Sequence, residues 1–99
     1  MLRIGHNAFL KCMNLKRITL PEGLRTIGEY CFQSTGLREV VIPNSVTEIL
    51  PFAFSACYSL ESVTLPEGIH TIAKNCFWES GLKEIAIPQG VQTICKGAF

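Results

Sequence analysis

The sequence predicts a solenoid of stacked units, α+β or mostly β in class, in which each 22–23-residue unit gives one parallel strand and a short helical or 3-10 turn. Residues at equivalent positions of successive units form columns, and three columns carry this prediction. A phenylalanine column has intervals of 23, 22, 23 and 22 residues: Phe9, Phe32, Phe54, Phe77 and Phe99. A proline column keeps in step with it: Pro21, Pro43, Pro66 and Pro88. An isoleucine column does the same: Ile4, Ile27, Ile49, Ile72 and Ile94. A fixed internal period of this length is typical of repeat proteins.

These columns divide the single domain of 99 residues into four complete units and a partial fifth. The predicted boundaries are 4–26, 27–48, 49–71, 72–93 and 94–99. The odd units read Phe-x-x-Cys-x-x-Leu, whereas the even units are one residue shorter and place glycine before the leucine. Two kinds of unit therefore alternate in a 45-residue super-repeat.

The strand is predicted where apolar and polar residues alternate, as they do over residues 15–21. Ile18 and Leu20 point to one side and Arg17 and Thr19 to the other. Proline ends the strand because it has no N–H for a ladder. A second apolar pair predicts a short extended return stretch. The i, i+4, i+5 spacing of Ile27, Cys31 and Phe32 then predicts one helical or 3-10 turn.

One unit cannot bury its apolar face alone, so the units must stack on a shared phenylalanine column. The chain opens at Ile4 with three residues ahead of it, and it stops at Phe99. Neither end carries a polar cap. We therefore expect a fragment of a longer repeat array, or ends that stack on another copy in head-to-tail self-association. Sedimentation across a concentration series checks the second alternative, which a strictly monomeric chain would contradict.

The segment Ile-Pro-Asn-Ser-Val-Thr-Glu-Ile-x-x-x-Ala-Phe-x-x-Cys-x-x-Leu, residues 42–60, resembles the BspA-like class of leucine-rich repeats. The resemblance covers essentially the whole chain. It implies a leucine-rich-repeat solenoid from a bacterial surface or secreted protein, with relatives in some protozoa, and roles in cell adhesion and protein binding. Leu50 and Cys95 depart from the class because they replace a small residue after the isoleucine, and Pro51 is unusual in that turn.

Composition excludes several classes of function. The net charge is +1 and the charges form no basic or acidic block, which argues against a nucleic-acid partner. Apolar runs are far shorter than the roughly 20 residues of a membrane span, so direct membrane insertion is not expected. The first residues carry no apolar signal-peptide core.

The five cysteines follow the repeat. Cys31 and Cys76 share a column with alanines, and Cys12 and Cys57 share another, which favours small buried residues over ligands. Disulfides and metal or redox chemistry are the weaker alternatives, since equivalent cysteines two units apart exceed the roughly 7 Å Cα limit of a disulfide. We expect five reduced thiols, with at least four largely buried.

No constellation predicts catalysis. His6 and His70 lie in different, polar columns and are interpreted as solvated surface residues rather than ligands. No glycine-rich phosphate loop and no Cys-x-x-Cys motif occur. The sequence thus predicts no catalytic residue, no cofactor and no metal.

The candidate partner-binding residues lie mostly on the outward side of the predicted strands. They are Arg17, Thr19, Glu39, Val41, Ser62, Thr64, Glu84 and Ala86, with Trp78 as a separate candidate on the turn side. Stacked solenoids use such extended faces to bind partners. The alternative for the strand residues is a solvated face of mixed charge. Trp78 belongs to a cluster of off-pattern aromatics on the turn side with Tyr30, Phe52 and Tyr58, and the alternative for Tyr30 and Phe52, which share a column, is half-buried packing.

We therefore predict a non-enzymatic interaction or adhesion module that binds a protein or cell-surface ligand. A structural spacer that binds nothing is the alternative. The resemblance implies a cell-surface or secreted location as part of a longer protein.

Overall fold

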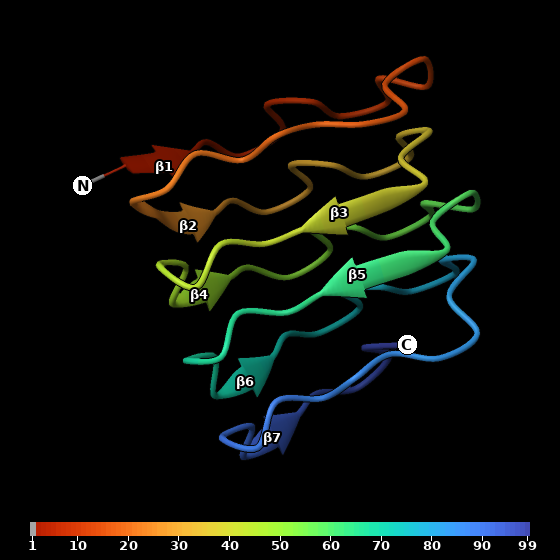
Figure 1. Cartoon of the computed structure of the whole chain (residues 1–99). Coiled ribbons are helices and arrows are strands. Elements are labelled where there is room, and N and C mark those ends of the chain that lie inside the picture. The colour runs from red at the N-terminus through yellow and green to blue at the C-terminus, as the bar shows by residue number, and fades with distance from the viewer. Residues whose placement is uncertain (1) are drawn as a thin grey trace.

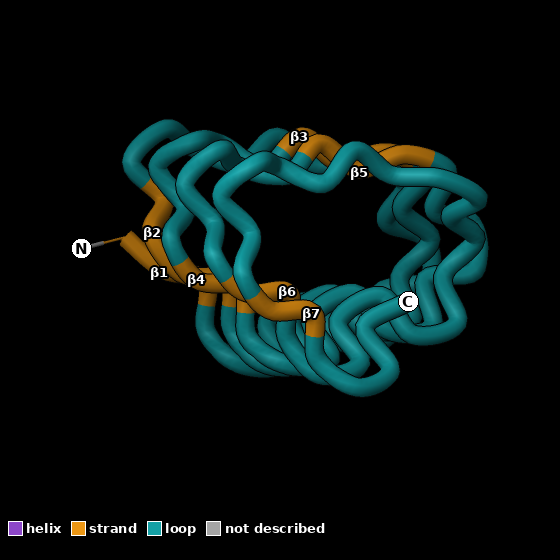
Figure 2. The backbone as a smooth tube through the Cα atoms, turned by 90° about the horizontal axis from the view of Figure 1, so that it is seen from below, coloured by secondary structure: helices purple, strands orange, loops and turns teal. Residues whose placement is uncertain are grey.

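The computed structural model describes residues 2–99, and in these residues the chain winds into a stack of flattened rings (Figure 1). Viewed along the stack, successive rings superimpose (Figure 2). The molecule measures 32 × 29 × 18 Å along its principal axes. These features confirm the solenoid of stacked units that the sequence predicts.

Strands lie on two opposite sides of the ring (Figure 2). One side carries β3 (Glu39–Val41) and β5 (Ser62–Thr64), which pair in parallel. The other side carries five short strands: β1 (Leu2–Ile4), β2 (Leu24–Ile27), β4 (Glu48–Ile49), β6 (Thr71–Ile72) and β7 (Thr93–Ile94). They form the sheets β1-β2-β4 and β6-β7, again with parallel pairing.

Two strand columns therefore replace the single strand per unit that the sequence predicts. The predicted column is regular in β3 and β5, while residues 17–19 and 84–86 run without ladder pairing. The predicted return stretch forms the other column. Its backbone joins neighbouring units, as in the hydrogen bond from the Leu50 N–H to the Ile27 carbonyl (3.0 Å). Each unit forms one flattened ring with two long sides. Both sides lie at strand spacing from the next unit, so both can form strands.

The third segment runs from the return strand to the leucine column, which is formed by Leu15, Leu37, Leu60 and Leu82. It is a chain of hydrogen-bonded turns rather than the expected helical or 3-10 turn. In unit three, the N–H groups of Phe52, Phe54 and Ala56 donate to the next unit at 3.1, 2.8 and 2.6 Å. The intervening N–H groups of Ala53 and Ser55 donate within their own unit at 3.3 and 3.2 Å. A helix would use all of these N–H groups internally and leave the neighbouring unit without donors.

This alternation requires left-handed backbone conformations at fixed positions. One column, two residues before the phenylalanine, has positive φ at Asn7, Tyr30, Phe52, Asn75 and Gly97. A second column, two residues after it, has positive φ at Lys11, Ser34, Ala56 and Glu79. Positive φ is uncommon for residues other than glycine and costs free energy. The repeated geometry must therefore be stabilised by what surrounds it.

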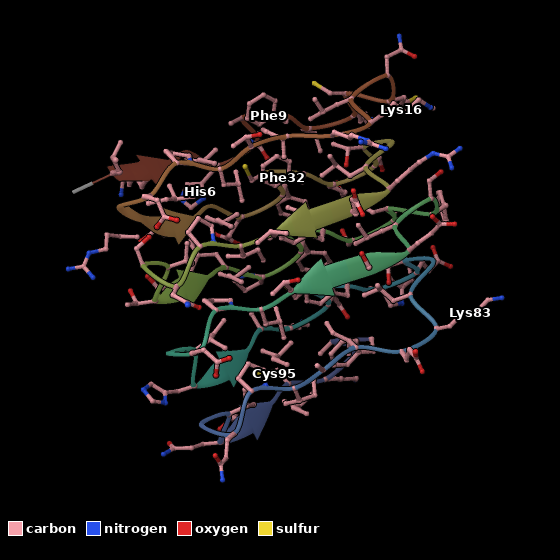
Figure 3. All side chains as sticks on the ribbon, viewed as in Figure 1. His6, Phe9, Lys16, Phe32, Lys83 and Cys95 are labelled. Carbon is pink, nitrogen blue, oxygen red and sulfur yellow. The ribbon has the colours of Figure 1, made fainter. Side chains whose placement is uncertain are left out.

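The phenylalanine column provides much of that stabilisation. Adjacent rings are stacked with centroid separations of 5.3, 5.2, 5.4 and 5.7 Å and interplanar angles of at most 11°. Figure 3 shows Phe9 and Phe32 in adjacent units. Phe32 and Phe54 are fully buried, as predicted, whereas Phe99 is 50% exposed at the end of the stack.

Phe54→Ala should lower the free energy of unfolding by about 3–5 kcal/mol, because it removes a buried ring and leaves a cavity between two stacked neighbours. Chemical denaturation monitored by circular dichroism measures the loss. Phe99→Ala is the matched control and should cost less than half as much, because its ring contacts one neighbour and is half exposed. Equal losses for the two variants would contradict a continuous buried column.

Candidate functional site

Eight of the nine candidate binding residues lie together on the β3–β5 side of the ring. All eight are exposed, and we call this surface the strand face: Arg17, Thr19, Glu39, Val41, Ser62, Thr64, Glu84 and Ala86. The register pairs Glu39 with Ser62 and Val41 with Thr64 across β3 and β5. The ladder therefore holds these four side chains in two parallel rows, and the equivalent residues of units one and four extend the rows without ladder pairing.

Two shallow hollows mark the strand face. One, of about 400 Å³, is lined by Arg17, Thr19, Glu39 and Val41 among others. The other, of about 420 Å³, is lined by Ser62, Glu84 and Ala86 among others. Val41 belongs to the row of Thr19, Thr64 and Ala86, and 66% of its surface is exposed. The face combines separated charges with small polar side chains and one apolar contact point.

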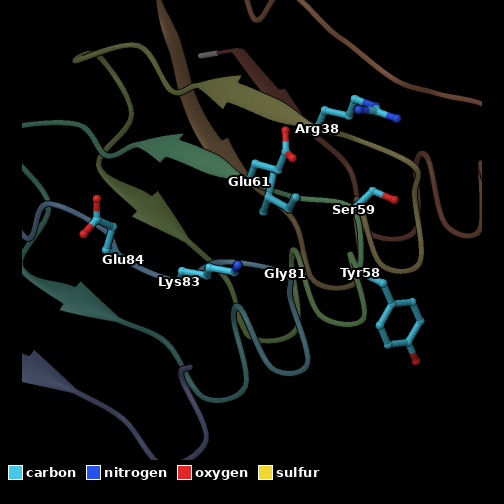
Figure 4. Close-up of a pocket in the computed structure, with 8 residues that line it drawn as sticks. Arg38, Tyr58, Ser59, Glu61, Gly81, Lys83 and Glu84 are labelled. Atoms are coloured by element: carbon cyan, nitrogen blue, oxygen red, sulfur yellow. The ribbon is translucent and has the colours of Figure 1, made fainter.

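A third hollow, of about 700 Å³, lies where the strand face meets the turns (Figure 4). Arg38 and Lys83 line it together with Glu61 and Glu84, so its charges balance. Tyr58 also lines it, with a ring that projects away from the ribbon and is 68% exposed. Tyr58 is off-pattern in the sequence, but the hollow beside it was not predicted, although the alternation of turn lengths could have indicated it.

The structure separates Trp78, the ninth candidate, from the strand face. It lies in the turns of residues 74–79, is 44% exposed, and lines none of the hollows of the strand face. Tyr30 and Phe52 are half-buried and stack on each other at 4.8 Å, which supports the packing alternative for this pair.

The expectation of at least four largely buried cysteines is wrong. All five are free thiols, but only Cys31, Cys57 and Cys76 are buried, while Cys95 is intermediate and Cys12 is exposed. The equivalent Cys57 is covered by the preceding unit, whose Thr35 hydroxyl lies 3.4 Å from its sulfur. Cys12 lies in the first unit of the described residues, in which no preceding unit lies over it.

Burial governs the chemistry of the three interior thiols. Desolvation raises the pKa of Cys31 and of Cys76 from 9.0 to about 12, against smaller opposing backbone hydrogen bonds. Desolvation also raises the pKa of Cys57. Since the thiolate is the nucleophile and the metal ligand, these thiols behave as small apolar side chains at neutral pH.

The two histidines are exposed, yet each bonds to a neighbouring unit. The Nδ1 of His6 accepts a hydrogen bond from the Glu29 N–H at 2.8 Å. The Nδ1 of His70 lies 3.2 Å from the Gly90 carbonyl oxygen, which requires the Nδ1–H tautomer for a hydrogen bond. Both contacts join consecutive units, a role that the sequence did not predict.

Residues 2–99 contain no group of three or more histidine, cysteine or acidic side chains placed to hold a metal ion. Within the same residues, no helix has the length and apolar character to cross a bilayer.

Parallel stacking, the phenylalanine column and the exposed strand rows define a repeat solenoid. The BspA type leucine-rich repeat region matches in six copies across residues 1–99, and the chain belongs to this family. Leucine-rich repeats of this kind are typically non-enzymatic and serve protein interaction.

Two solved structures of leucine-rich repeat proteins are similar to this chain. One, from Bacteroides ovatus ATCC 8483, has a TM-score of 0.97 and 37% identity, and the match covers 99% of this chain and 26% of that one. The T. pallidum leucine-rich repeat protein (TpLRR) has a TM-score of 0.88 and 38% identity over 95% of this chain and 45% of its own. This chain thus spans less than half of either relative. No curated protein gives a significant match.

The raised thiol pKa values predict how stability depends on pH. In the folded chain Cys31 and Cys76 stay protonated up to about pH 12, whereas in the unfolded chain they ionise near pH 9. Their contribution to stability is complete below pH 9 and is lost as the pH rises toward 12, by about 1.4 kcal/mol per pH unit for each thiol. Urea unfolding at several pH values measures this slope.

The double variant C31A/C76A provides the comparison, because Ala53 occupies the same column and is fully buried. Its stability should fall less steeply than that of the parent between pH 9 and 12. Identical slopes would mean that these thiols are not desolvated in the native state.

Proposed function

We propose that the chain is a non-enzymatic interaction or adhesion module whose strand face contacts a protein or cell-surface ligand. The observation that supports the proposal is the exposure of eight side chains in two rows on one side of the ring, four of which belong to the paired strands β3 and β5. The backbone of these four residues is fixed by the pairing, so it loses little conformational freedom on binding, which favours affinity. Membership of the family supports a role in protein interaction in general. The use of the strand face and the kind of ligand are our proposal.

The composition of the strand face indicates the kind of ligand. One row reads Arg17, Glu39, Ser62 and Glu84, so basic and acidic groups lie on neighbouring units. The other row offers hydroxyls beside the exposed Val41. Such a surface suits a polar protein segment that supplies both charges, more than a uniformly charged polymer.

We place this activity on a secreted or cell-surface protein, as the family resemblance implies. We also propose head-to-tail association of this 99-residue chain. Its support is the exposure of apolar side chains on the outermost strands and last turn, with 51% for Leu2, 54% for Ile94 and 50% for Phe99. Sedimentation velocity across a concentration series tests it, and a monomer at every concentration would contradict it.

A structural spacer is the second candidate. The mixed charges of the strand face favour it, because oppositely charged neighbours also serve solubility without any partner. The two functions differ in one respect: only the interaction module depends on which side chains occupy the strand face.

The triple variant R17S/E39S/E84S tests that difference, since Ser62 shows that serine fits this row. Peptides selected from a phage-displayed library on the parent chain should share a consensus sequence. Their affinity for the triple variant, measured by biolayer interferometry, should fall about tenfold or more.

The control variant R25S/E29S/E48S makes the same net charge change with exposed residues outside the strand face. It should leave the affinity within about twofold of the parent, a difference below 1 kcal/mol. Selection without a consensus, or equal binding to both variants, would favour the spacer.

A further inference from the structure

The long units one and three have one more residue than the short units two and four in the turn between phenylalanine and leucine. The leucine column keeps its place in every unit, with Leu37 and Leu60 fully buried. The extra residue of an odd unit must therefore bulge outward. Met13 and Tyr58, in the long turns of units one and three, are 70% and 68% exposed.

The short turn of unit two lies between these two projecting turns. A Cβ added at Gly36 would collide with the Met13 carbonyl oxygen and lie 3.3 Å from that of Leu15. Gly81 of unit four meets Tyr58 and Leu60 in the same way. The short turns are thus drawn in against the backbone of the preceding long turn, and unit two forms the floor of a groove.

This groove, which we call the turn groove, has a volume of about 350 Å³. Its walls and rim include Lys11, Met13, Lys16, Ser34, Gly36 and Tyr58. Its lining contains two lysines and no carboxylate, in contrast to the balanced hollow on the other side of Tyr58. The turn groove therefore carries a local positive charge between an exposed methionine and an exposed tyrosine.

The groove is preformed by the backbone. Lys11 is held in a left-handed conformation (φ 61°), with its N–H donating to the Gln33 carbonyl at 2.8 Å. Its own carbonyl accepts the Met13 N–H at 2.8 Å. The backbone of Lys11 and Met13 is thus fixed relative to unit two, which forms the floor of the groove. This lowers the entropic cost of binding.

We propose that the turn groove binds an extended acidic segment of a partner protein. Carboxylates of the segment pair with Lys11 and Lys16, and an apolar side chain packs between Met13 and Tyr58. Methionine and tyrosine suit such a contact because both offer adaptable apolar area. The site is separate from the strand face, so neither proposal depends on the other.

Charge reversal at the two lysines tests the proposal with substitutions that the fold already accommodates. Glu79 shares the positive-φ column of Lys11, and Glu61 shares the column of Lys16. The variant K11E/K16E should therefore fold like the parent, which circular dichroism checks. The control K74E/K96E makes the same charge change in a column that contains Glu29.

The probe is a fluorescein-labelled peptide of alternating glutamate and leucine, with a glutamine–leucine peptide for comparison. Fluorescence anisotropy should show binding of the glutamate peptide that weakens with salt. K11E/K16E should weaken it by about tenfold or more, while K74E/K96E and the strand-face variant R17S/E39S/E84S change it by less than about twofold.

Equal binding of the glutamine peptide, or no effect of K11E/K16E, would overturn the proposal. Heparin provides the remaining arm. If it binds in a K11E/K16E-dependent manner while the glutamate peptide does not bind, the groove recognises a sulfated polysaccharide and the peptide proposal is wrong. The two proposals can fail separately. A negative result with R17S/E39S/E84S in the strand-face experiment does not bear on the turn groove, and a negative result with K11E/K16E does not bear on the strand face.

Discussion

The structure depends on hydrogen bonds from the turn segment of one unit to the next. Phe9, Phe32, Phe54 and Phe77 each donate their backbone N–H to the following unit at 2.8 Å. The same residues stack their rings along the same direction. The backbone hydrogen bonds and the ring stacking therefore join the same neighbouring units. Together they set the spacing between units that both strand columns follow. The cost of the left-handed residues beside them is met only within the stack.

The sequence predicted what depends on side-chain periodicity. The phenylalanine and leucine columns, the parallel stacking and the outward position of Glu39 and Ser62 all follow from the repeat. The prediction from the sequence was wrong where a backbone N–H can donate either within its own unit or to the next unit. The spacing of Ile27, Cys31 and Phe32 fits a helical turn, yet alternate N–H groups point to the neighbouring unit instead. Burial of Cys12 also failed, because a column describes a residue's place in a unit and not whether another unit covers it.

The two candidate sites differ in how far the sequence alone could locate them. The strand face could be located from alternation alone, and its eight residues are indeed exposed together. The turn groove arises from a difference of one residue between units and from glycines with no room for a Cβ. Its signal is in the sequence as the 45-residue alternation, but its shape requires knowing that the leucines stay in register. Contacts such as the Ser45 hydroxyl with the Leu24 carbonyl (2.7 Å) required coordinates.

Native-state amide hydrogen exchange, followed by NMR, shows directly whether the hydrogen bonds between units hold the stack together. We expect the N–H groups of Phe32 and Phe54 to exchange only through global unfolding, since each residue is buried and donates to the next unit. Both should therefore report one common opening free energy, equal to that from denaturant unfolding. Exchange of these two amides as fast as that of the exposed Gly68 would contradict the account, because the hydrogen bonds between units would then not hold the stack together.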